Sequence, residues 1–217
     1  MIRVLLADDE AMIRAGIRSI LSTDQGIEVV AEAADGREAV DLTIAHRPDV
    51  VLMDVRMPRM DGLAAAAAIQ AVAPEIAVVV LTTFDEDDYV TAALDAGAAG
   101  FLLKAADPRE LLLAVHAVAD GGAYLSPRIA KKVIARWDGG GFATKTAARA
   151  RIAELTDRER AVLAGVGRGL ANQDIAAELF VAESTVKAHV SGILRRLGLT
   201  NRVQAAILAH EAGLTGH

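Results

Sequence analysis

Val50-Val51-Leu52-Met53-Asp54 places four apolar residues directly before a carboxylate, and this pattern decides the fold of the first half of the chain. Other short apolar runs end in the same way: residues 4–7 precede Asp8 and Asp9, residues 78–81 precede Thr82, and residues 101–103 precede Lys104. A fifth run, residues 27–33, ends without such a residue. Short apolar runs of this kind predict buried β-strands.

The segments between these runs have the spacing of helices. After the first run, Ile13, Ile17, Ile20 and Leu21 recur on one helical face, and residues 107–120 repeat the pattern. Buried strands that alternate with helices are typical of a parallel sheet covered on both sides. We therefore predict an α/β domain over residues 1–122, with a doubly wound, flavodoxin-like sheet of five parallel strands in the order 2-1-3-4-5.

In such a sheet, the residues that follow the strands meet at one edge, where open α/β folds place their chemistry. Each of these residues alone has an ordinary explanation, such as a turn or a helix cap for an aspartate. Together, Asp8, Asp9 and Asp54 would repel one another, and Mg²⁺ with oxygen ligands would relieve that repulsion. Asp54 could then accept a phosphoryl group, while Lys104 and Thr82 contact its oxygens.

Composition and charge separate the two halves of the chain. The 217 residues suffice for two domains, contain no cysteine and begin without a secretory signal, so we expect a cytoplasmic protein that does not enter the membrane. Residues 1–122 carry 21 Asp/Glu and 9 Lys/Arg, a formal charge of −12, whereas residues 123–217 carry 8 and 14, a charge of +6. This asymmetry suggests that the second half alone meets a polyanion, although ordinary solvated faces would explain it equally well.

Residues 123–150 are predicted to link the two domains. The first part, residues 126–137, has a helical apolar pattern that begins near Pro127. From Asp138-Gly139-Gly140-Gly141 onward little can be buried, so residues 138–150 are predicted to be flexible.

Residues 151–217 are predicted to form four short helices. Thr156 and Glu159 have the spacing of a capping box before the first helix, and residues 172–179 form the second. The third, residues 184–197, has an apolar stripe of Val186, Val190, Ile193, Leu194 and Leu197 opposite a face with Ser184, Lys187, Ala188, Ser191 and Arg195. This arrangement is typical of a helix-turn-helix, although a small helical core with a solvated face fits the pattern too. No second His or Cys at ligand spacing accompanies His189, which favours a packing or phosphate role over metal binding.

The motifs of the first half resemble the receiver domain of bacterial response regulators of the NarL/FixJ group. They are Asp8-Asp9-Glu10, residues 53–62, Leu81-Thr82-Thr83-Phe84 and residues 96–104. The resemblance implies that Asp54 is the phosphoacceptor, that Asp9, Asp54 and the Arg56 carbonyl bind Mg²⁺ with Asp8 nearby, and that Thr82 and Phe101 form a switch pair. Two positions depart from the pattern: Ala105-Ala106 follow Lys104, and Phe101 stands where Tyr is also common.

The second half resembles the LuxR-type DNA-binding domain in residues 155–160, 169–176, 185–190 and 201–206. The resemblance implies that Lys187, Ala188 and Ser191 face base edges, and that Thr185, Arg195, Arg202 and the 156–160 turn lie near phosphates. Ala182 stands where a capping serine is frequent, which weakens the start of the third helix by ~1 kcal/mol.

The two resemblances together imply a DNA-binding transcriptional response regulator. Its partners would be a histidine kinase, promoter DNA and RNA polymerase, and phosphorylation would favour a homodimer through the receiver or through residues 201–213. It would not be an enzyme, apart from the part that Asp54 takes in its own phosphoryl transfer and hydrolysis. Two alternatives stay open: a regulator that binds DNA independently of phosphorylation, and an aspartate-based phosphohydrolase. The second resembles a family that needs another Asp two positions after the nucleophile, where this chain has Arg56.

Overall fold

The computed structural model describes residues 1–83, 92–126, 129–130 and 142–215. By their internal contacts, the described residues fall into two compact units. The first comprises residues 1–119 together with 124–130, and the second comprises residues 120–123 together with the described part of 131–217. Within the described ranges, no helix is long and apolar enough to cross a bilayer.

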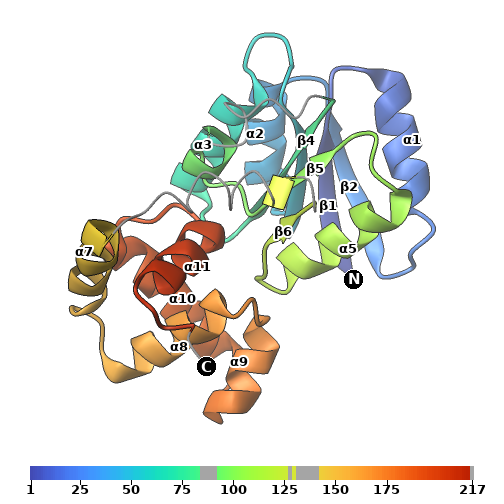
Figure 1. Cartoon of the computed structure of the whole chain (residues 1–217). Helices are drawn as coiled ribbons and strands as arrows, with labels where there is room; N and C mark the ends of the chain where they lie inside the picture. Colours follow the sequence, from blue (N-terminus) through green and yellow to red (C-terminus); the bar gives the residue numbers. More distant parts are fainter. Residues whose placement is uncertain (84–91, 127–128, 131–141, 216–217) are drawn as a thin grey trace. The chain divides into compact units, whose positions relative to one another are not determined.

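The first unit contains a parallel sheet in the order β2-β1-β3-β4-β5-β6 (Figure 1). Its strands are β1 Ile2–Ala7, β2 Ile27–Ala33, β3 Val50–Asp54, β4 Ala77–Thr82, β5 Gly100–Leu103 and β6 Tyr124–Leu125. The predicted order of the first five strands is confirmed. The predicted number of strands is wrong, because β6 pairs with β5 and extends the unit beyond residue 122.

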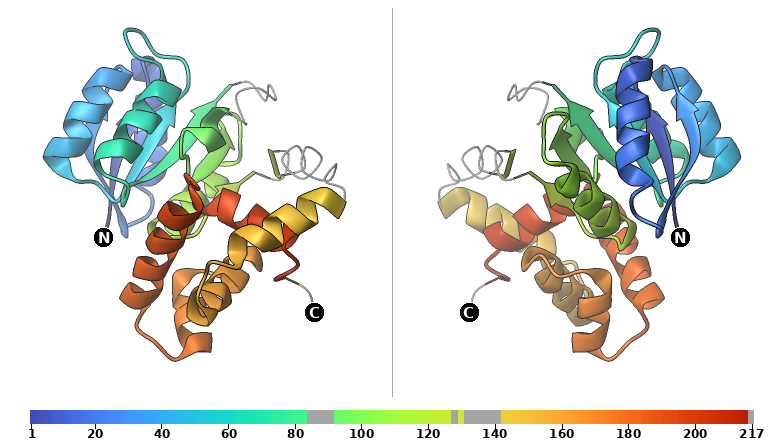
Figure 2. Two further views of the ribbon diagram at one scale, coloured as in Figure 1. Left: turned by 90° about the vertical axis from the view of Figure 1, so that its left-hand side faces the viewer. Right: turned by 90° about the vertical axis from the view of Figure 1, so that its right-hand side faces the viewer.

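Helices cover both faces of this sheet (Figure 2). Helices α1 Ala11–Leu21 and α5 Pro108–Ala119 contact each other on one face, and α2 Gly36–His46 and α3 Gly62–Val72 contact each other on the opposite face. The core on the α1 and α5 side contains Ile17, Leu21 and Val115 packed against alternate strand residues such as Val4 and Leu52. Because successive strand residues point to opposite faces, the strands must be apolar throughout, as their sequences are.

The second unit is helical. Its helices are α7 Phe142–Ile152, α8 Asp157–Gly167, α9 Asn172–Leu179, α10 Glu183–Leu197 and α11 Arg202–Glu211. Its core contains the predicted stripe of α10, with Val186, Ile193 and Leu197 buried and Val190 and Leu194 packed against them. The helices predicted at 172–179 and 184–197 are therefore confirmed within one residue at each end.

The predicted flexible segment is wrong for residues 142–150, which belong to α7. Ala148 and Ile152 of this helix are buried in the same core as α8 and α11, so the helical unit includes α7 and starts before residue 151. The helix predicted over 126–137 and the glycines at 139–141 fall almost entirely outside the described residues.

Candidate functional site

Four strands deliver chemically active side chains to one edge of the sheet. Asp8 follows β1, Asp54 ends β3, Thr82 ends β4 and Lys104 follows β5. The parallel register aligns these positions, since Ala7 pairs with Met53, Asp54 with Leu81 and Thr82 with Leu103. The edge is tightened further by a hydrogen bond of 2.7 Å from the Lys104 backbone N–H to the Thr82 carbonyl.

Asp8, Asp9 and Asp54 form an acidic cluster in which the possible ligand oxygens all lie within 4.8 Å of one another. Asp8 and Asp54 are buried, whereas Asp9 is exposed. Asp8 Oδ1 accepts a hydrogen bond of 2.9 Å from the Glu10 backbone N–H, and the fully buried Asp8 Oδ2 accepts none with good geometry from the described residues. A cluster of three carboxylates with closely spaced oxygens fits a hard divalent cation. The residues present could therefore hold a metal ion.

Lys104 supplies the positive charge at this cluster. Its Nζ lies 2.6 Å from Asp8 Oδ2 and 3.0 Å from Asp54 Oδ1, and only 8% of its side chain is exposed. Burial lowers the pKa of Lys104, but the hydrogen bonds and charges of the two carboxylates outweigh it, and its pKa lies above the ordinary value. The amine is thus held as an ammonium ion beside the carboxylate of Asp54.

Asp54 shows the opposite balance. Burial raises the pKa of its carboxyl group, and the hydrogen bond and charge of Lys104 offset that effect only in part. The nearby charge of Asp8 raises the pKa further. A cation among these carboxylates would reverse this balance and favour the ionised form of Asp54, which is the nucleophilic one.

The loop after Asp54 is held tightly at its far end. A Cβ atom on Gly62 would lie 1.8 Å from the Asp54 carbonyl oxygen, and the Gly62 N–H donates to the Val55 carbonyl at 2.9 Å. Arg59 forms an ion pair with the buried Asp35, which caps α2 by accepting from the Glu38 N–H. These contacts fix the path of the backbone around Arg56, whose side chain is exposed.

The two switch residues that the resemblance implies lie on strands β4 and β5, and the side chains of both are buried. Thr82 and Phe101 are 3% and 1% exposed, so neither side chain can turn outward without a change in its surroundings. In this structure the ring of Phe101 occupies the interior position.

The helix-turn-helix presents its polar face to solvent. On α10 the residues predicted opposite the apolar stripe, together with the neighbouring Thr185, are all exposed: Ser184, Thr185, Lys187, Ala188, Ser191 and Arg195. Lys187 Nζ lies 2.8 Å from Glu183 Oε1 one turn earlier. Ala182 precedes the helix and provides no side-chain cap, in agreement with its sequence.

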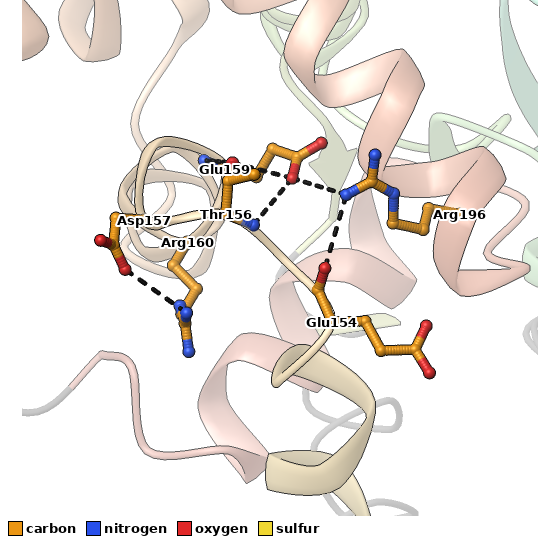
Figure 3. Close-up of polar contacts among 6 residues, drawn as sticks. All are labelled: Glu154, Thr156, Asp157, Glu159, Arg160 and Arg196. Carbon is orange, nitrogen blue, oxygen red and sulfur yellow. Dashed lines mark hydrogen bonds and ion pairs between the residues drawn. The ribbon is translucent and has the colours of Figure 1, made fainter.

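A polar cluster joins the start of α8 to the end of α10 (Figure 3). Glu159 Oε2 accepts from the Thr156 backbone N–H and hydroxyl, both at 2.9 Å, and from Arg196 Nη1 at 2.8 Å. The Glu159 backbone N–H donates back to Thr156 Oγ1, which completes the predicted capping box. The sequence does not indicate a role for Arg196, because periodicity places it beside the exposed face of α10 and gives no sign of a partner on α8.

Arg202, which the resemblance places near phosphates, is buried at the start of α11. It is 7% exposed, and its guanidinium group donates to Asn172 Oδ1 at 2.8 Å and to the Leu170 carbonyl. Burial lowers the pKa of Arg202 to about 10. Its donors are directed toward α9 and the turn before it, so Arg202 joins α11 to the start of α9.

Comparison with known families gives two matches that divide the chain as the structure does. Residues 4–116 match the family model described as response regulator receiver domain. Residues 153–209 match the model described as bacterial regulatory proteins, luxR family.

Similar proteins align over nearly the whole chain. The uncharacterized transcriptional regulatory protein YxjL of Bacillus subtilis (strain 168) is 42% identical over 215 residues, with 98% of this chain and 97% of that protein covered. The transcriptional regulatory protein LiaR of the same strain is 39% identical, with 97% of each covered. The response regulator VraR of Staphylococcus aureus (strain Mu3 / ATCC 700698) is 39% identical, with 98% of each covered.

Two solved structures are also similar. The response regulator ChrA of a heme-sensing two-component system is 38% identical, with 98% of both chains covered and a TM-score of 0.53. The isolated receiver domain of RcsB from Salmonella enterica serovar Typhimurium, solved in the presence of a beryllofluoride phosphomimetic, is 25% identical with a TM-score of 0.56, covering 60% of this chain and 97% of that one.

Proposed function

This chain belongs to the two-component response regulators that join a receiver domain to a LuxR-type DNA-binding domain, and we propose that phosphorylation of Asp54 sets its affinity for DNA. One observation carries the proposal: Asp54 lies among two further carboxylates, with the Lys104 ammonium 3.0 Å from its Oδ1. The proposed donor is a histidine kinase and the proposed compartment is the cytoplasm.

The cation proposed for the acidic cluster is Mg²⁺, held by Asp8, Asp9, Asp54 and the Arg56 carbonyl. When bound, it neutralises the charge of the carboxylates and of the incoming phosphoryl oxygens. A carboxylate oxygen of Asp54 forms a bond to phosphorus as the bond between phosphorus and the kinase imidazole nitrogen breaks, and that nitrogen takes up a proton. Lys104 and Thr82 then hold the phosphoryl oxygens by charge and by hydrogen bonding.

The DNA partner is proposed from the exposed face of α10. Lys187, Ala188 and Ser191 would meet base edges in the major groove, and Thr185 and Arg195 would meet phosphates. Because Ala188 and Ser191 offer few hydrogen bonds, base readout would depend mainly on Lys187 and on DNA shape.

Phosphorylation is proposed to act by shifting the equilibrium between two conformations of the receiver domain. Contact of the Thr82 hydroxyl with the phosphoryl group, which would hold the Phe101 ring in the interior position that it already occupies, would favour a receiver conformation that dimerises and brings two α10 helices onto two half-sites. The coupling is reciprocal, so bound DNA favours the phosphorylated conformation. RNA polymerase would be the further partner at the promoter.

The test uses the full chain and a duplex selected from a randomised library. Acetyl phosphate with Mg²⁺ is expected to tighten binding at least 10-fold and to raise the molar mass measured by light scattering. Asp54→Asn is the matched control, since it keeps the shape of the side chain and removes the nucleophile. Equal affinity and mass for the two proteins would refute phosphate control and leave a regulator that binds DNA independently of phosphorylation. Steady release of phosphate from small esters over many turnovers would instead indicate a phosphohydrolase.

A further inference from the structure

Arg14 of α1 contacts the backbone of the acidic cluster. Its Nη1 donates a hydrogen bond of 2.6 Å to the carbonyl oxygen of Asp8, and its side chain is 18% exposed. That carbonyl belongs to the peptide that joins Asp8 to Asp9. A rotation of this peptide would change the direction of both carboxylates that are proposed to face the metal.

Few other contacts hold this loop in place. Glu10 precedes α1 at the N-cap position and provides no side-chain cap. Within the described part of the chain, the polar contacts of Asp8 besides those of Arg14 and Lys104 are its N–H to the Ala33 carbonyl at 3.1 Å and its Oδ1 with the Glu10 N–H. Arg14 is therefore the side chain that holds the Asp8 carbonyl oxygen, and with it the peptide group between Asp8 and Asp9.

The guanidinium group is itself held from the neighbouring strand. Arg14 Nε lies 3.4 Å from Glu32 Oε2, and Glu32 on β2 is the register partner of Leu6 on β1. The other oxygen, Glu32 Oε1, lies 2.9 Å from Nη1 of Arg18, whose side chain is 57% exposed. Both arginines thus share one carboxylate, and of the two, Arg14 is the one hydrogen-bonded to the Asp8 carbonyl in the described structure.

We propose that Arg14 is a positioning residue for the metal-binding loop: it orients the peptide between Asp8 and Asp9 so that the acidic cluster is already arranged for Mg²⁺. This inference rests on the proposed function. Arg18 contacts the same carboxylate and carries the same charge, so the effect proposed for Arg14 alone is the orientation of the Asp8 carbonyl. Preorganised ligands bind a cation more tightly, since less conformational freedom is lost on binding.

The experiment compares Arg14→Met with Arg18→Met in the full chain. Both remove one positive charge and one contact to Glu32, but Arg14→Met alone removes the hydrogen bond to Asp8. We expect Arg14→Met to raise the Mg²⁺ dissociation constant, measured by titration calorimetry, about 10-fold. It should also speed amide hydrogen exchange at Asp9 and Glu10 in metal-free protein. Arg18→Met should stay within 2-fold of the wild type in both measurements.

Two further measurements keep the inference open to refutation. Arg14→Lys, which can still donate to the carbonyl, should recover most of the Mg²⁺ affinity even if Arg14→Met is poorly folded. With acetyl phosphate, Arg14→Met should raise the Mg²⁺ concentration needed for half-maximal phosphorylation and leave the rate at saturating Mg²⁺ within about 2-fold. Equal Mg²⁺ affinities for Arg14→Met and Arg18→Met would overturn the inference, whereas a wild-type chain that binds no Mg²⁺ would refute the proposed function itself.

Discussion

Gly62 illustrates how a single residue constrains the site. Its hydrogen atom occupies the space where a Cβ would lie 1.8 Å from the Asp54 carbonyl oxygen. Because that obstacle is backbone, Gly62→Ala cannot be relieved by a rotamer change, and we expect a loss of about 2 kcal/mol or more in the free energy of unfolding. Gly16 in α1 is the matched control: a Cβ there meets nothing within 4 Å, so Gly16→Ala should stabilise the protein by roughly 0.5 to 1 kcal/mol. Urea denaturation of both variants checks the pair, and equal shifts would contradict it.

The ionised carboxylate of Asp54 is expected to lower the free energy of unfolding of the metal-free protein. Since burial raises the pKa of its carboxyl group, the folded state binds the proton more tightly than the unfolded chain does. Its contribution to stability is therefore present below the ordinary pKa of 3.8 and is lost as the pH rises through the raised value. In metal-free protein at pH 7, Asp54→Asn should therefore increase the free energy of unfolding, because it removes the buried charge whose cost raises this pKa. The gain should shrink as the pH is lowered toward 4, and a gain that does not depend on pH would contradict this account.

Residue positions were predictable from the sequence where the strand pattern determined them. Asp8, Asp54, Thr82 and Lys104 each follow an apolar run, so a parallel sheet had to bring them to one edge. The burial of Arg202 was not predictable, because it depends on how α11 packs against α9, and helical periodicity carries no information on that packing. The contact between Arg14 and the Asp8 carbonyl depends on side-chain and loop geometry in the same way.

At the scale of the element, Glu159 and Arg196 connect α8 to α10. Glu159→Gln should retain the capping box, since an amide oxygen can accept from Thr156, and should lose the ion pair with Arg196. Hydrogen bonds from the Thr156 backbone and hydroxyl lower the pKa of Glu159, with a further contribution from Arg196, so its stabilisation is present above pH 4.5 and is lost as the pH falls through the lowered pKa. We expect Glu159→Gln to cost roughly 0.5 to 1 kcal/mol at pH 7.

A double-mutant cycle isolates this connection. Arg196→Met should destabilise the wild type but have little further effect in the Glu159→Gln background, because the shared ion pair is already gone. Additive losses in thermal unfolding would show that the two residues act separately.

Two elements escaped prediction for different physical reasons. Strand β6 has two half-buried residues, too few to give the alternation or the apolar run that marks a strand. Helix α7 is rich in Thr, Lys and Arg and buries Ala148 and Ile152 near its end, so its sequence resembles a solvated linker. The strongly periodic α10, in contrast, was found from its stripe alone.

Within the described residues, each of the two units has hydrophobic packing of its own. Calorimetry of the full chain should therefore show two unfolding transitions. Beryllofluoride with Mg²⁺ should raise the transition of the receiver unit, and duplex DNA should raise that of the helical unit. For a ligand at 100 times its dissociation constant, each stabilisation should be about 2.7 kcal/mol. A single transition that responds to both ligands would contradict independent cores.

Two contacts restrain the backbone on one side of Asp54. They are the ion pair between Arg59 and Asp35 and the close approach of Gly62 to the Asp54 carbonyl. The loop beyond it is fastened to the start of α2 by the Gly36 N–H, which donates to the Met60 carbonyl at 3.1 Å. A new group on the Asp54 carboxylate would meet resistance in that direction. The displacement would therefore be expected on the side of β4 and β5. The anchored loop thus determines which part of the receiver moves when Asp54 is modified.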